Sequence, residues 1–313
     1  MIPIPQIPEN SLYVMMAIFS ILVSATLILL FMRIKNNTTD YTELRQRIKS
    51  WWWMIGIVFI ALILSKTTAI VFFGFLSFLA LKEFLSIVPT RQSDRRIIFW
   101  AYVAIPINYY WVLISWYGMF IIFVPVCVFM FFSIGMVLIG ETKGFIRSAG
   151  TLHWAVMLNV FCISHIAYLL VLPDKNTKAG SIGLVLFLIF ITEFNDVCQY
   201  LWGKTIGKHK IVPKVSPNKT WEGFLGGIAT ATLCAGFLAP FLTPLSFLSG
   251  LVAGMILSIG GFFGDTVISS VKRDLHIKDT GNMIPGHGGI LDRMDSLIFT
   301  SPLFFHFIYY WAY

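Results

Sequence analysis

Long, continuous apolar runs make up most of this chain, and short polar connections separate them. About ten of the runs approach the roughly 20 residues that a helix needs to cross a membrane. They cover residues 12–32, 51–64, 67–88, 97–114, 117–140, 149–172, 180–203, 221–243, 245–272 and 295–313. Because the runs are apolar throughout instead of alternating, they favour helices over the strands of a barrel. The pattern predicts an all-α polytopic membrane protein with about ten transmembrane helices.

The composition agrees with a membrane protein and gives no sign of a soluble domain. Hydrophobic residues make up 57% of the chain and aromatic residues 16%, and the mean hydropathy is +0.80. The polar connections are too short to fold independently. We therefore expect one integral membrane domain over 1–313, with N-terminal helices in 1–140 and catalytic helices and loops in 180–313. Its active site must be built from helix ends and connections.

Positive charge is distributed unevenly between alternate connections. The chain has 23 Lys and Arg residues, and all but Lys66, Lys175 and Lys178 fall on one side of the alternating runs. The positive-inside rule places that side in the cytoplasm and both termini outside, provided that 51–64 and 67–88 span separately. We expect a bacterial inner (cytoplasmic) membrane protein with its active site facing the cytoplasm. The net charge of +8 mostly reflects this topology, and the basic connections also suit an anionic lipid surface. No nucleic acid is expected as a partner.

A basic and aromatic patch, Arg45 to Trp53, begins the second run. Trp51, Trp52 and Trp53 are typical of the aromatic belt at a membrane interface. We interpret them as anchors in preference to ligand contacts. The patch therefore marks the cytoplasmic boundary of this helix.

Three clusters of polar residues lie where the bilayer would ordinarily exclude them, and the first is on the run 180–203. Glu193, Asp196 and Tyr200 are spaced at i, i+3 and i+7 and so share one helical face. Intramembrane carboxylates are functional candidates by default, although they also form structural pairs with other helices. Because two acids without a neighbouring cation need a metal ion or a proton, we favour the functional interpretation.

The second cluster is the basic connection 203–223. Lys208, Ser216, Lys219 and Thr220 precede the next apolar helix, whose free N–H groups and dipole favour an anion. The connection therefore predicts a phosphate site, although it lacks the spacing of a Walker A loop. A basic anchor for the membrane surface is the alternative.

The third cluster joins the end of the ninth run to the start of the last one. Asp265 and Lys272 share one stripe of a helix, and Asp292 and Asp295 share another. Glycines and a proline between the two helices allow a tight return, which would bring Asp292 beside Asp265. Two carboxylates flanked by Lys272 and Arg273 suit a hard divalent cation that grips phosphate oxygens. The cluster thus points to phosphoryl or nucleotidyl transfer.

His287 stands between glycines in this return, where the backbone could approach a ligand closely. Its ring could contact a phosphate or a base of a ligand. It could instead form a purely structural hydrogen bond, and the sequence leaves both alternatives open. The other histidines show no partner pattern, and we assign them no role.

At these residues the sequence closely resembles the phosphatidate cytidylyltransferase, or CDP-diacylglycerol synthase, family. The family signature SxVKRxxxxKDxGxxIPxHGGIxDRMD is filled at every specified position from Ser269 to Asp295. The connection 203–223 is similar to a second motif of the family. The resemblance is strong over the C-terminal part of the chain, whereas the remainder is similar only in its number of helices.

The resemblance implies transfer of CMP from CTP to phosphatidic acid or a related lipid phosphate, giving CDP-diacylglycerol and pyrophosphate. It implies Mg2+ as the cofactor, with K+ as a second cation, and it leaves a homodimer open. Carried over to this chain, the catalytic residues are Asp196, Asp265, Lys272 and Asp292, and the metal ligands are Asp196, Asp265 and Asp292. The implied substrate-binding residues are Lys208, Ser216, Lys219, Thr220, Arg273, Lys278, His287, Gly288, Gly289 and Arg293.

One departure from the family and two other protein classes stay as alternatives. Val197, Cys198 and Gln199 stand where the family usually has small residues, which favours an accessory paralogue with a different lipid acceptor. An intramembrane aspartyl protease could use Asp196 and Asp265, but it would leave the basic motif without a role. An ion-coupled transporter could use the same acids, but the sequence shows no internal repeat of the kind found in such proteins.

Overall fold

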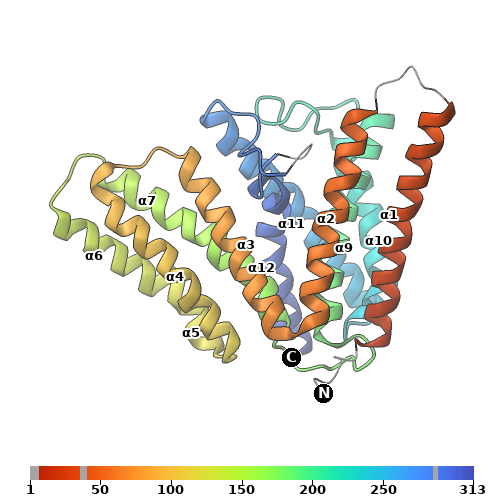
Figure 1. The fold of residues 1–313 in the computed structure, drawn as a ribbon, viewed down its shortest axis with the longest axis horizontal. Helices are drawn as coiled ribbons and strands as arrows, with labels where there is room; N and C mark the ends of the chain where they lie inside the picture. The colour runs from red at the N-terminus through yellow and green to blue at the C-terminus, as the bar shows by residue number, and fades with distance from the viewer. Residues whose placement is uncertain (1–6, 36–40, 285–287) are drawn as a thin grey trace.

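The computed structural model describes residues 7–35, 41–284 and 288–313, and this part of the chain is helical apart from its connections. Each predicted run corresponds to a helix or to a helix with an internal irregularity (Figure 1). The uninterrupted helices are α1 (Glu9–Lys35), α2 (Thr42–Leu64), α3 (Lys66–Ile87), α4 (Arg95–Leu113), α9 (Gly180–Ile206), α10 (Trp221–Leu242), α11 (Phe247–Asp274) and α12 (Leu291–Ala312). The prediction of an all-α protein is confirmed.

Two of the predicted spans contain a short π-helical stretch. The first consists of α5 (Tyr117–Ile122), η2 (Phe123–Val128) and α6 (Phe129–Ile139), and the second of α7 (Phe145–Val156), η3 (Met157–Cys162) and α8 (Ile163–Leu169). Pro125 lies in η2 and has no N–H to donate, which accounts for the altered hydrogen bonding there. No such cause is evident in the sequence of η3.

Eight helical segments of the described chain are long and apolar enough to cross a membrane. The other two long helices, α4 and α12, carry more polar side chains. Much of α12 is buried among other helices, including Phe304, Phe305 and Ile308, so it needs less of an apolar outer face. The chain is a polytopic integral membrane protein, as predicted.

The break between the second and third spans occurs at Ser65. α2 ends at Leu64, and Ser65 has extended backbone angles. Its hydroxyl accepts a hydrogen bond from the N–H of Thr68 at 2.9 Å and so caps α3. The separation of these two spans at Lys66, which the charge distribution required, is confirmed.

Helices α10 and α11 pack closely through small residues. An added Cβ at Gly254 would lie 2.5 Å from the Cβ of Ala235, and one at Gly250 would collide with Ala239. Small residues at i and i+4 on both helices allow this approach, which is a common basis of helix association in lipid. The helix that follows Lys219 and the helix that carries Asp265 are thereby held at a short separation.

The order of the helices places the polar motifs at one end of the bundle. In Figure 1 the N and C labels lie together at one end, and the α9–α10 and α11–α12 connections lie at the other. An even number of spans accounts for this arrangement. The second and third polar clusters are therefore neighbours in space although 203–223 and 265–295 are separate in sequence.

Candidate functional site

One cavity of about 910 Å³ lies between α9, α10, α11 and the start of α12, and α2 contributes to its wall. The predicted site residues that line it are Asp196, Ser216, Lys219, Thr220, Asp265, Lys272, Lys278, Gly288, Asp292 and Arg293. These residues come from all three polar clusters. The fold thus brings parts of each cluster to one place.

An ion pair between the start of α10 and α11 forms one wall of the cavity. Lys219 Nζ lies 2.8 Å from Asp265 Oδ2 and also donates a hydrogen bond to the carbonyl of Phe262 at 3.2 Å. Lys219 directly precedes Thr220, which caps α10 by accepting the N–H of Gly223. The cap fixes the start of α10 and so the position of the lysine that precedes it. The Asp265 side chain keeps 33% of its surface exposed, so the carboxylate is accessible from the cavity.

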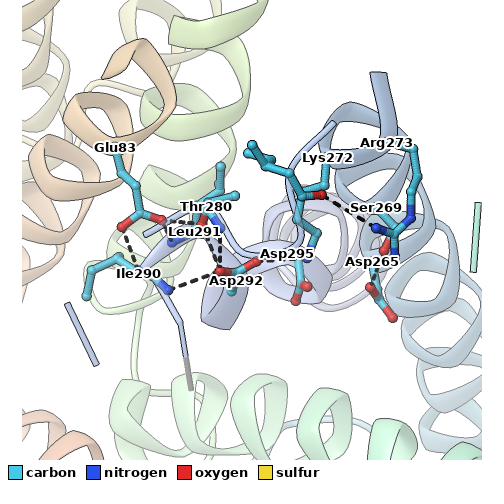
Figure 2. Close-up of polar contacts among 12 residues, drawn as sticks. Glu83, Asp265, Ser269, Lys272, Arg273, Thr280, Ile290, Leu291, Asp292 and Asp295 are labelled. Carbon is cyan, nitrogen blue, oxygen red and sulfur yellow. Dashed lines mark hydrogen bonds and ion pairs between the residues drawn. The ribbon is translucent and has the colours of Figure 1, made fainter. Parts of the chain in front are cut away.

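A second ion pair joins α11 to α12 (Figure 2). Lys272 Nζ lies 2.8 Å from Asp292 Oδ1. Asp292 Oδ2 accepts the N–H of Thr280 at 2.8 Å, the hydroxyl of Thr280 at 2.9 Å and the N–H of Gly289 at 3.0 Å. Asp292 is 5% exposed, and these donors offset the cost of burying a carboxylate. Asp265 also has a protein partner on each oxygen, but Asp292 has more donors and is far less exposed.

Further acids add negative charge to the same cavity. Glu193, Asp196 and Asp295 line it, and Asp196 accepts a hydrogen bond from the Ser296 hydroxyl at 2.7 Å. Asp196, Asp265 and Asp295 lie close enough for their charges to repel one another. A bound cation would relieve this repulsion. This group of acids is therefore the part of the cavity best suited to a positively charged ligand.

The carboxylates fit a hard divalent cation by their chemistry, although they do not form a closed cage. Within the described residues, no three His, Cys, Asp or Glu side chains are grouped so as to hold a metal ion by themselves. Mg2+ in nucleotide-dependent enzymes is usually bound by one or two carboxylates, with water and substrate phosphates as its other ligands. Asp265 together with Asp196 or Asp295 matches this partial set.

Three of the predicted site residues that the structure describes do not border the cavity. Lys208 is exposed, and its backbone N–H donates to Glu222 at 3.0 Å. Arg273 is exposed and donates from Nε to the carbonyl of Val215 at 3.1 Å, which joins α11 to the basic connection. Gly289 is buried and serves Asp292 through its N–H. His287 lies outside the described residues, so its contact with a phosphate or base stays a prediction.

Three side chains near the site were missed by the sequence interpretation. Arg47 and Trp51 of α2 line the cavity, so Trp51 is more than an interfacial anchor. Glu83 of α3 accepts hydrogen bonds from the loop that carries Gly289 and from the start of α12 (Figure 2). A lone glutamate within the apolar run 67–88 was the available signal for Glu83, because intramembrane carboxylates are candidates by default. For Arg47 and Trp51 the only signal was their i, i+4 spacing.

Comparison with known proteins finds a matching family model and similar proteins. The family model described as "Cytidylyltransferase family" matches residues 45–311. The protein named "Uncharacterized protein YnbB" of Escherichia coli K12 is 41% identical over 296 residues, which cover 95% of this chain and 97% of that protein. Phosphatidate cytidylyltransferases of Staphylococcus epidermidis and Staphylococcus aureus are 38% identical over 146 residues and 39% identical over 148 residues. Each staphylococcal match covers 46% of this chain and 56% of the relative.

Proposed function

The chain belongs to the cytidylyltransferase family of nucleotidyltransferases, and from this premise we propose that it transfers CMP from CTP to a lipid phosphate. The proposed acceptor is phosphatidic acid or a related lipid phosphate. An oxygen of the acceptor phosphate forms a bond to the α-phosphorus of CTP as the bond to pyrophosphate breaks. The products are CDP-diacylglycerol, or the corresponding CDP-lipid, and pyrophosphate. The names of the staphylococcal relatives support this choice of acceptor.

The observation that carries the proposal is the pairing of cations with carboxylates around one cavity. Lys219 and Lys272 are each held by an aspartate, so their ammonium groups are already placed where phosphate oxygens could bind. Arg293 also lines the cavity, and its buried Nε has no hydrogen-bond partner among the described residues. A triphosphate would supply such a partner. Mg2+, for which Asp265 and Asp196 are the proposed ligands, would neutralise phosphate charge.

We assign the lipid acceptor to the side of the cavity formed by α2 and α9. Arg47 and Trp51 come from one face of α2, and Val197 and Tyr200 come from α9. Val197 and Tyr200 are also exposed, as is usual for side chains that face lipid. A guanidinium binds phosphate oxygens well, and an aromatic ring beside it suits the membrane interface. This side therefore offers both a phosphate contact and an apolar approach.

A direct assay tests the proposed function. Purified protein is incubated with CTP labelled at the α-phosphate, Mg2+ and phosphatidic acid in detergent micelles. We expect label in the lipid phase together with release of pyrophosphate, and no labelled lipid when diacylglycerol replaces phosphatidic acid. Absence of labelled lipid with phosphatidic acid and with other lipid phosphates would refute the proposal.

The proposed orientation places the cavity on the cytoplasmic side of the membrane. Cysteines introduced at the exposed positions of Lys208 and Lys178 lie in connections at opposite ends of the bundle. In intact cells, a membrane-impermeant maleimide should label Lys178→Cys but not Lys208→Cys. Both should react after the cells are opened, and the unmodified protein gives the background from its four own cysteines. Labelling of Lys208→Cys in intact cells would reverse the orientation.

Lipid preference should depend on Val197 and not on the adjacent Cys198. Val197 lines the cavity, whereas Cys198 is buried outside it at 6% exposure. Val197→Ala removes two methyl groups from the acceptor side, so we expect the ratio of rates between two lipid phosphates to change by roughly 10-fold, the usual effect of such apolar contacts. Cys198→Ala is the matched control and should keep the wild-type ratio. The CTP requirement should be the same in both variants.

A further inference from the structure

Glu83 connects the N-terminal helices to the motif that carries Asp292 (Figure 2). It lies near the end of α3, is 8% exposed, and accepts the N–H of Ile290 at 2.8 Å and of Leu291 at 3.1 Å. The Thr280 hydroxyl, which faces both Glu83 and Asp292, lies within hydrogen-bond distance of Glu83. These donors are far from Glu83 in the sequence. A single buried carboxylate thus binds both sides of the α11–α12 connection.

The position of Glu83 matches the needs of the first turn of α12. The first N–H groups of a helix have no partner within the helix, and a negative charge near them is favourable. α12 has no side-chain cap at Ile290. Glu83 supplies the missing acceptor from another helix.

Gly289 shows that the contact constrains the local sequence. A Cβ added to Gly289 would overlap the Glu83 carboxylate. The same glycine donates its N–H to Asp292. Because Gly289 has no side chain, the Glu83 carboxylate of α3 can approach its backbone, while its N–H binds the Asp292 carboxylate of α12.

Thr280 links the two carboxylates. Its hydroxyl is within hydrogen-bond distance of Glu83 and lies 2.9 Å from Asp292 Oδ2, and its N–H donates to the same Asp292 oxygen at 2.8 Å. Displacement of Glu83 would release Thr280 and the amides of α12 together. Asp292 and its ion pair with Lys272 depend on that segment for their position.

We propose that Glu83 is a positioning residue for CMP transfer, which acts through Thr280 and the first turn of α12 to keep Asp292 in the cavity. This role of Glu83 in turnover rests on the proposed function. The helix α3, outside the C-terminal motifs, is by this inference part of the transfer machinery.

The test compares Glu83→Gln with Asp94→Asn. In Glu83→Gln an NH2 group faces N–H donors, so we expect kcat to fall roughly 10- to 100-fold, as is typical when a supporting hydrogen-bond partner is lost. The KM for CTP should change by less than about threefold, because the cations of the cavity are untouched. Asp94 is the matched control, since it is also buried, in the turn just before α4, and is bound by Arg91 and Ser148 away from the cavity. Asp94→Asn should lower Tm but keep the wild-type kcat.

Hydrogen exchange separates this inference from the proposed function. In Glu83→Gln, peptides that cover 288–295 should lose amide protection, whereas Asp94→Asn should leave them unchanged, with or without a functioning transfer assay. Unchanged protection, or a wild-type kcat in folded Glu83→Gln, would overturn the inference. If Glu83→Gln fails to purify, Thr280→Val decides, because it removes only the linking hydroxyl. A lower kcat and faster exchange in Thr280→Val support the inference, and wild-type values for both refute it.

Discussion

Asp292→Asn is expected to abolish CMP transfer and to destabilise the protein at the same time. One oxygen of Asp292 binds Lys272, and the other accepts from Thr280 and Gly289. An asparagine must turn its NH2 group toward one of these sets, so a donor meets a donor in either orientation. Removing one partner of a buried ion pair costs about 3–5 kcal/mol. We expect the loss of preorganised charge to lower turnover by at least roughly 100-fold.

Turnover and the thermal midpoint of the same preparation check this result. Asp274→Asn is the matched control, because Asp274 is an exposed acid at the end of α11 and does not line the cavity. It should keep wild-type turnover and Tm. An Asp292→Asn protein with wild-type turnover would remove Asp292 from the site.

Asp265→Asn should abolish transfer without destabilising the fold. A third of the Asp265 side chain remains exposed, and ion pairs with this degree of solvent contact contribute little to stability. The carboxylate nevertheless belongs to the acidic group that we assign to Mg2+, so its neutral amide should lower turnover roughly 100- to 1000-fold. The measurement is the rate over a series of Mg2+ concentrations, with Tm recorded in parallel.

Ser269→Ala provides the comparison for Asp265→Asn. The Ser269 hydroxyl donates to Asp265 Oδ1 at 3.2 Å, so its removal loosens the carboxylate and leaves the charge in place. We expect a loss of less than about 10-fold, in line with one neutral hydrogen bond. The metal assignment would be wrong if Asp265→Asn kept both the wild-type rate and the wild-type Mg2+ dependence.

The helices could be predicted from the sequence because the bilayer imposes a simple rule. Runs of apolar residues long enough to span, with charge at alternate connections, identified each span and predicted the split at Lys66, one residue from the observed break. The π-helical stretches could not be predicted in the same way. They change the hydrogen-bond pattern without changing the hydropathy of the run.

Ten of the predicted site residues line one cavity, but the sequence did not predict how they pair. The return between α11 and α12 was expected to place Asp292 beside Asp265, and both do line one cavity. In the structure each carboxylate instead forms an ion pair with a lysine: Lys272 for Asp292 and Lys219 for Asp265. Helical spacing shows which residues share a face, whereas the pairing depends on the rotation of each helix. That rotation is set by packing between distant segments.

The contribution of α2 and α3 to the site was beyond the reach of motif analysis. Glu83 belongs to no pattern of spaced residues, and it accepts hydrogen bonds from residues far away in the chain. Arg47 shares only an i, i+4 spacing with Trp51, and it lines the cavity beside residues of distant helices. In the sequence, only the presence of an acid within an apolar run indicated Glu83 as a candidate. The partner of such an acid can be found only when the neighbouring helices are known.

The small-residue contact between α10 and α11 has a mechanical consequence for the cavity. Gly250 and Gly254 interlock with Ala239 and Ala235, so sliding of one helix along the other would force backbones apart. The wall with Lys219 and Asp265 is therefore expected to be stiff. Any closing motion around bound substrate should occur in the exposed part of the connection 207–214, because Lys219 and Thr280 are tied to neighbouring helices. Substrates would then be enclosed by loop movement over a helical frame that keeps its shape.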